Sequence, residues 1–153
     1  MKNIYKQVKK MLWVSYTLAM VTGCNVYSAN DTDIIAMTIL AEARGEGEAG
    51  MYAVAAVISQ RSLDRKQTAR QVCLAKWQFS CWNGKKANDL KHLLKLPQAK
   101  YAKRLAANIH SLNRNYVLYA DHYHATWMKK KPYWAKVYKP VKTIGQHVFY
   151  TSK

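Results

Sequence analysis

Residues 41–48 read AEARGEGE and join two apolar stretches that both have the composition of helices. The segment contains three acidic side chains, Glu42, Glu46 and Glu48, in a chain that has only eight acidic residues against 25 Lys and Arg. Gly45 suits the end of the first helix, because glycine readily adopts the left-handed conformation that closes helices. A carboxyl at such a helix end is a candidate for acid–base chemistry, and a solvated turn is the alternative.

The apolar stretch before this segment predicts a helix that starts near Asp31 and ends at Gly45. Because the stretch is apolar on nearly all sides, we expect this helix to be central in the fold. Glu42 falls on the same face as Ile39, so its carboxyl should lose solvation and its pKa should rise. Glu46 would raise that pKa further through like charge. A general acid that works near neutral pH needs such an elevated pKa.

After the segment, small and branched apolar residues recur at helical spacing and predict a second helix over residues 50–61. A polar loop is expected over residues 62–67, followed by a short helix that Thr68 caps and that continues through Cys73. Residues 97–112 show a further amphipathic pattern, with apolar residues on one face and basic residues on the other. We interpret these helices as packing elements.

Two strands are predicted near the C-terminus, over residues 121–127 and 144–150. We expect them to pair in an antiparallel sheet. Residues 129–142 are rich in lysine and contain two prolines, so a loop is expected there. Residues 30–153 would then form one α+β domain, mainly helical with a small antiparallel sheet and long enough to bury its own core.

Residues 77–84, WQFSCWNG, mix aromatic side chains with amides and hydroxyls. The mixture suits a carbohydrate groove, because aromatic faces pack against the apolar faces of sugars while amides and hydroxyls bind sugar hydroxyl groups. An edge strand whose aromatic side chains fill the core is the alternative. On the strand predicted further along the chain, His122 and His124 share one face beside Asp121, an arrangement that can ligate a metal ion.

Residues 1–29 have the composition of a targeting segment, with four lysines before an apolar run and no acidic residue. The stretch VTGC at residues 21–24 resembles a lipobox, in which Cys24 would be lipidated and become the new N-terminus. Residues 26–28 offer a site for ordinary signal cleavage, and an uncleaved membrane anchor is the third alternative. All three predict export to the periplasm or cell envelope, and the first and third attach the N-terminus to the membrane.

Cys73 and Cys81 are separated by seven residues. Exported proteins meet oxidising conditions, in which two nearby cysteines favour a disulfide. Because the loop between them is small, such a bond would stabilise the fold by about 2–3 kcal/mol.

The formal net charge of the chain is +17. Since residues 1–29 hold four lysines and no acid, residues 30–153 carry 21 basic and eight acidic side chains, a formal charge of +13. A field of this size attracts polyanions. We expect no nucleic-acid partner, because the chain has an export signal and no recognition motif, so anionic polymers of the cell envelope are the candidates.

Five segments follow one another in the order AEARGE, MYAVAAVISQR, QFSCWN, DHYH and IGQHVFY, within residues 33–150. In this order they resemble the SleB-type cell-wall hydrolases, a group that includes spore-cortex-lytic enzymes and related muralytic proteins. The resemblance implies a lysozyme-like fold of the lytic-transglycosylase kind. It also implies cleavage of the β-1,4 bond between N-acetylmuramic acid and N-acetylglucosamine in the glycan strands of peptidoglycan, without a metal or another cofactor.

The resemblance further implies roles for individual residues. Glu42, the first acidic residue of the EARGE motif, would be the catalytic acid. The substrate-binding residues would come from the QFSCWN and HYH segments, namely Gln78, Phe79, Ser80, Asn83, His122, Tyr123 and His124.

The small number of acidic residues favours a lytic transglycosylase, which needs one carboxyl and leaves 1,6-anhydro ends. A second carboxyl, Glu46 or Asp121, would instead give a lysozyme-type muramidase that hydrolyses the same bond. Two other classes stay open. One is a zinc amidase or peptidase built on His122, His124 and Asp121, and the other is a glycan-binding protein without catalytic activity.

Overall fold

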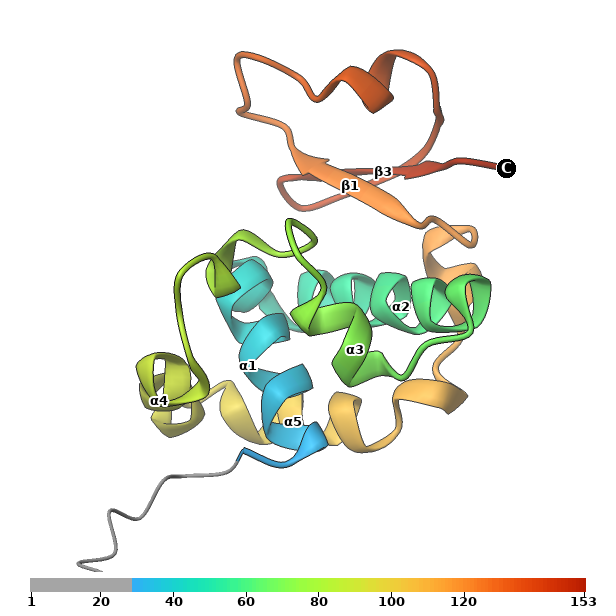
Figure 1. Ribbon diagram of the computed structural model, residues 1–153. Helices are drawn as coiled ribbons and strands as arrows, with labels where there is room; N and C mark the ends of the chain where they lie inside the picture. Colours follow the sequence, from blue (N-terminus) through green and yellow to red (C-terminus); the bar gives the residue numbers. More distant parts are fainter. Residues whose placement is uncertain (1–28) are drawn as a thin grey trace, which may run out of the picture.

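The computed structural model describes residues 29–153, so Cys24 and nearly all of the predicted targeting segment lie outside the described residues. The helices are α1 (Asp31–Ala43), α2 (Gly47–Arg65), α3 (Ala69–Leu74), α4 (Ala87–Leu90) and α5 (Ala99–Ala107), and the strands are β1 (His122–Ala125), β2 (Lys139–Ile144) and β3 (His147–Thr151). Figure 1 shows the helices packed together with the sheet lying along one side of them. This is the predicted α+β, lysozyme-like architecture.

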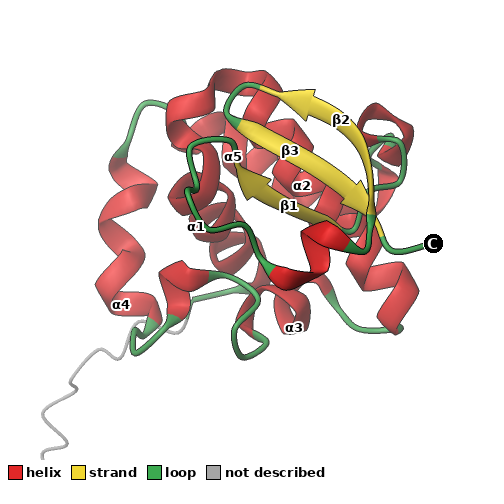
Figure 2. Ribbon diagram, turned by 90° about the horizontal axis from the view of Figure 1, so that it is seen from above, coloured by secondary structure: helices red, strands yellow, loops and turns green. Residues whose placement is uncertain are grey.

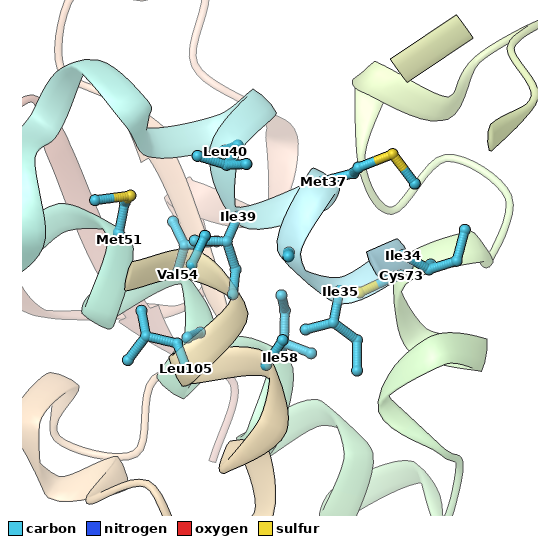
Figure 3. Packing of buried hydrophobic residues seen from close by; sticks show 14 of the residues in the cluster. Ile34, Ile35, Met37, Ile39, Leu40, Met51, Val54, Ile58, Cys73 and Leu105 are labelled. Atoms are coloured by element: carbon cyan, nitrogen blue, oxygen red, sulfur yellow. The ribbon is translucent and has the colours of Figure 1, made fainter. Parts of the chain in front are cut away.

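The first helix, α1, is central, as its composition predicts. Every side chain from Asp33 to Leu40 is buried, and the helix packs against α2, α3 and α5. Figure 3 shows Ile39 of α1 beside Val54 of α2, with Leu105 of α5 nearby. Burial of each such side chain contributes about 1.5–3 kcal/mol, which fixes the position of α1 within the helical layer. Among residues 29–153, no helix has the length and apolar composition that a membrane span requires.

Two helices differ in length from the sequence prediction. The second helix, α2, runs to Arg65 through the segment predicted as a loop, because no glycine or proline interrupts it. It ends where Lys66 takes the left-handed conformation. The last helix, α5, ends at Ala107, where the side chain of Asn108 donates a hydrogen bond to the carbonyl of Arg104. Polar side chains at a helix end satisfy the carbonyls that the next turn would have bonded.

The predicted short helix after the loop is confirmed as α3. Thr68 accepts a hydrogen bond from the backbone N–H of Gln71, and the Gln71 side chain accepts one from the backbone of Thr68. This reciprocal pair is a capping box. The segment that follows is no edge strand, because residues Ser80–Trp82 form a short 3₁₀ turn.

The three strands form one antiparallel sheet in the order β1-β3-β2, as Figure 2 shows. The predicted pairing of the two C-terminal strands is confirmed, with Tyr123 opposite Phe149. The predicted strand at 144–150 is wrong at its start, because a turn at Gly145 separates β2 from β3. The predicted loop at 129–142 is also partly wrong, because β2 begins at Lys139. Its proline is tolerated because β2 is an edge strand.

The disulfide predicted between Cys73 and Cys81 is not formed, and both are free cysteines. Each thiol has its own hydrogen-bond partner, which is Thr38 for Cys73 and Glu42 for Cys81. Burial raises the pKa of both thiols to about 12, so both stay protonated. Spacing in the sequence shows only that two cysteines can meet, whereas the packing decides where each thiol points.

Candidate active site

A cleft of about 490 Å³ is lined by the end of α1, by Arg61 of α2, by residues of the segment after α3, and by β1 and its neighbours. Five of the predicted site residues line it together, namely Glu42, Gln78, Ser80, Tyr123 and His124. They come from three parts of the chain that are far apart in sequence. The first part is the helix end at the AEARGEGE segment, which places its carboxyl at the edge of the apolar core.

Glu42 is held by hydrogen bonds and largely shielded from water. Its Oε2 accepts a hydrogen bond from the hydroxyl of Tyr123 at 2.8 Å, and the thiol of Cys81 also hydrogen-bonds to the carboxyl. Burial raises the pKa of Glu42 above its ordinary value, although these hydrogen bonds and the charge of Arg61 act to lower it. The predicted rise in pKa through burial is confirmed, but the further rise predicted from the charge of Glu46 is not among its causes.

Tyr123 is a rigid hydrogen-bond donor to this carboxyl. Its hydroxyl is deeply buried, and burial together with the negative charge of Glu42 raises its pKa well above the ordinary value. The ring packs edge-on to His147 at 5.0 Å between centroids and lies 5.6 Å from Phe149. Tyr123 therefore stays protonated in the pH range of any cell and keeps the carboxyl of Glu42 in one orientation.

Arg61 is a cleft residue that the sequence interpretation missed. Its Nε donates a hydrogen bond to the carbonyl of Asp121 at 2.6 Å, its guanidinium lies 5.3 Å from the ring centroid of Phe79, and its Nη1 is buried without a hydrogen-bond partner. The guanidinium also acts electrostatically on Glu42. The sequence did contain a signal for this role, since Arg61 lies on the apolar face of the predicted second helix. Charged side chains are rarely buried unless they are paired, so an arginine on that face indicates a functional contact.

Three predicted substrate-binding residues lie elsewhere. Phe79 is 2% exposed and belongs to the core beneath the cleft, and Asn83 lines a separate hollow. His122 packs against Trp134 and Tyr138, with ring centroids 4.9 and 4.8 Å away, and does not line the cleft. On β1 it is Tyr123, not His122, that reaches Glu42, through the hydrogen bond of its hydroxyl to the carboxyl.

The two predicted second carboxyls are engaged in other contacts. Glu46 accepts a hydrogen bond from the backbone N–H of Gln146 at 2.7 Å. Asp121 accepts hydrogen bonds from the hydroxyl and backbone of Ser152 and is paired with His122 at 3.0 Å. Burial acts to raise the pKa of Asp121, but these hydrogen bonds outweigh it and the pKa lies below its ordinary value. Neither residue lines the cleft.

The HxH pair is also occupied by neighbouring groups. One ring nitrogen of His124 lies 2.9 Å from the carbonyl of Ala125, and the other lies 3.0 Å from the hydroxyl of Tyr150. The ring of His122 is paired with Asp121. Across residues 29–153, no three His, Cys, Asp or Glu side chains are grouped so that they could hold a metal ion.

Two tryptophans that line the cleft are exposed to solvent. Trp77 is 72% exposed and Trp127 is 71% exposed, values that are high for a residue type that is usually largely buried. The aromatic content of the 77–84 segment predicts a sugar groove in general terms, but it does not single out either ring. Both rings are therefore available for contact with a ligand bound in the cleft.

Comparison with protein-family models matches residues 45–150 to the family described as Cell Wall Hydrolase. The match covers more than two thirds of the chain and begins three residues after Glu42. It includes the cleft residues that come from α2, the segment after α3 and the sheet. Comparison with curated proteins and with solved structures found no match. The chain belongs to the cell wall hydrolase family and is an enzyme that acts on the cell wall, with a role in degrading peptidoglycan.

Proposed function

We propose that the protein is a lytic transglycosylase that cleaves the β-1,4 bond between N-acetylmuramic acid and N-acetylglucosamine, with Glu42 as its one catalytic carboxyl. The observation that carries this proposal is the composition of the cleft. Within the part of the chain that the structure describes, Glu42 is the one acidic residue that lines it. Glycosidases that use water as the nucleophile place a second carboxyl across the bond, about 5–9.5 Å from the first.

The acidic residues that follow Glu48 all have partners outside the cleft. Asp64 pairs with Lys153, and Asp89 accepts a hydrogen bond from the backbone N–H of Lys86 at 2.7 Å. Asp121 accepts hydrogen bonds from the backbone N–H and the hydroxyl of Ser152. None of these three carboxylates lines the cleft, which supports a mechanism that works with one carboxyl.

In the proposed reaction, protonated Glu42 donates its proton to the glycosidic oxygen while the bond from this oxygen to C1 of the muramic acid breaks. The resulting carboxylate then takes the proton from the C6 hydroxyl of the same sugar, whose oxygen bonds to C1 and closes a 1,6-anhydro ring. No water is consumed. The hydroxyl of Tyr123 orients the carboxyl in both steps, and the charge of Arg61 stabilises its ionised form between them.

The sugar ends that the enzyme leaves on purified peptidoglycan distinguish a lytic transglycosylase from a hydrolysing muramidase. We expect mass spectrometry to detect 1,6-anhydro-muramic ends, which are one water lighter than the reducing ends that a muramidase leaves. Glu42→Gln should lower the rate by about 10²–10⁴-fold, the usual contribution of a general acid. Reducing ends would show that the enzyme is a hydrolase, and unchanged activity of Glu42→Gln would overturn the role of Glu42.

We also propose that the enzyme works in the cell envelope, either free in the periplasm or attached through its N-terminus. The support is the targeting composition of residues 1–29 together with the location of the substrate. Fractionation of cells that make the full chain, followed by mass determination of the mature N-terminus, tests this. An intact N-terminal methionine in a cytosolic fraction would contradict it.

A further inference from the structure

Trp77 stands between two hollows of the surface. It lines the cleft that contains Glu42 and also a second hollow of about 290 Å³, to which Trp82, Asn83 and Gly84 contribute. With 72% of its surface exposed, the indole ring contributes little to the core. The Nζ of Lys76 lies 5.3 Å from the centroid of the Trp77 ring, and the exposed ring borders both hollows.

The backbone at Trp77 carries strain, because its Cβ lies too close to the backbone in this conformation. Its φ is +66°, the left-handed region, which costs a bulky residue about 1–3 kcal/mol. The turn is closed by a hydrogen bond of 3.1 Å from the N–H of Gln78 to the carbonyl of Ala75. A glycine would form this turn without strain, as Gly84 does at a φ of +69° in the same segment. The chain therefore keeps an exposed indole where the backbone alone favours glycine.

Polar groups suited to sugar hydroxyls lie on both sides of the Trp77 ring. Gln78 and Ser80 line the cleft, and Asn83 lines the second hollow. Trp82, which lines the second hollow, is tied to α1, because its indole N–H donates a hydrogen bond to the hydroxyl of Thr38 at 2.9 Å. Aromatic faces flanked by amides and hydroxyls match the alternation of apolar faces and hydroxyl edges along a glycan strand.

We propose that Trp77 is a stacking platform for one sugar of the bound strand, and that the second hollow is a distal subsite that binds the sugars beyond it. The inference rests on the proposed function of the Glu42 cleft. If the second hollow is a subsite, the substrate is a long glycan strand that is bound over more sugar units than the cleft alone accommodates. The same proposal explains how Asn83 can bind substrate although it lies outside the cleft.

The test is the dependence of binding on glycan length, measured in the Glu42→Gln background so that the ligand is not cleaved. Affinity for purified peptidoglycan glycan fragments should rise from the disaccharide to longer oligomers. We expect Trp77→Gly to flatten this rise and to weaken the binding of the longest oligomers by about tenfold, the effect of losing one stacked sugar. Asn83→Ala should weaken the long oligomers more than the disaccharide.

Tyr119→Gly is the matched control. Tyr119 is also an aromatic residue with 54% of its surface exposed and a φ of +59°. Unlike Trp77, it lines neither hollow. Both glycine variants relieve backbone strain and should unfold at the same or higher denaturant concentration than the parent, so a binding loss seen for Trp77→Gly alone is not caused by misfolding.

Two results would overturn the inference. One is an unchanged length dependence in Trp77→Gly, and the other is an equal loss for all lengths including the disaccharide, which would place Trp77 in the cleft alone. A failure of the proposed function is separate, because it would appear as reducing ends left by the parent enzyme or as cleavage by the Glu42→Gln protein, whatever residue 77 is.

Discussion

Glu42, the proposed catalytic acid, illustrates at the scale of one residue how a buried carboxyl opposes stability. Its carboxyl lies against the core, and burial raises its pKa above the ordinary value of 4.5. The folded state therefore binds the proton of Glu42 more tightly than the unfolded state does. As pH rises from the ordinary pKa through the elevated one, the unfolded chain gains the ionised form first and the folded state loses stability. Above the elevated pKa the full unfavourable contribution is present.

Glu42→Gln should therefore stabilise the protein at pH 7 while it removes activity. The glutamine side chain has no charge to desolvate, and its amide oxygen can still accept the hydrogen bond from Tyr123. Each unit of pKa elevation corresponds to about 1.4 kcal/mol. Denaturant unfolding of both proteins at pH 7 and at pH 4 checks this, and the advantage of the variant should shrink at the lower pH. An advantage that does not change with pH would contradict the desolvation of Glu42.

At the scale of elements, the turn between α1 and α2 is joined to the β2–β3 hairpin through Glu46. Its Oε2 accepts the N–H of Gln146, and a Cβ added to Gly145 would stand 2.1 Å from this oxygen. Gly145 also has a φ of +55°. A Cβ added to Gly50 would stand 2.2 Å from the Cβ of Glu46, so that glycine too leaves room for Glu46. Close approach and a positive φ both require glycine at residue 145.

Glu46→Gln and Glu46→Ala separate this structural role from catalysis. The amide oxygen of a glutamine can accept the same hydrogen bond, so Glu46→Gln should keep most of the lytic activity and stability. Glu46→Ala loses the bond and should lower the free energy of unfolding by about 1.5–3 kcal/mol, the usual range for a charge-assisted hydrogen bond. Turnover of peptidoglycan and denaturant unfolding measure the two effects. If Glu46→Gln folds but is inactive, Glu46 is a second catalytic carboxyl and the enzyme is a hydrolase.

At the scale of the whole molecule, we propose that the positive charge gives the enzyme a long-range attraction to the anionic cell envelope. Residues 30–153 carry a formal charge of +13, and Lys129, Lys130 and Lys131 are exposed between two cleft residues, Met128 and Pro132. Anionic polymers of the envelope would be drawn toward the cleft by this field. Salt shortens its range, from about 10 Å at 0.1 M to about 3 Å at 1 M.

We expect turnover of intact cell walls to fall several-fold between low and high salt, while turnover of a short uncharged glycan fragment stays nearly constant. Replacing Lys129, Lys130 and Lys131 with glutamine should reduce the salt dependence on walls. Thermal unfolding in the same buffers controls for effects of salt on the fold. Equal turnover of walls at low and high salt would show that charge does not guide the enzyme to its substrate.

The sequence alone determined the features that depend on neighbours along the chain. The nearly continuous apolar composition of residues 34–40 predicted that α1 is central, because such a helix must be covered on all sides. The rarity and position of Glu42 marked it as a candidate acid, and its burial then followed from that helix. The hydrophobic pattern at the C-terminus predicted the antiparallel pair but missed the turn at Gly145, because the alternation continues across it.

The tertiary structure decided what surrounds Glu42. Its hydrogen bond to Tyr123 joins residues 81 positions apart, and the bond from Arg61 to the carbonyl of Asp121 joins residues 60 apart. Contacts of this range depend on how the sheet packs on the helices, which local patterns do not encode. The packing also decided that the thiol of Cys81 hydrogen-bonds to Glu42 and forms no disulfide with Cys73. Local hydrophobicity sets which faces are buried, whereas only the packed layers set which polar groups meet there.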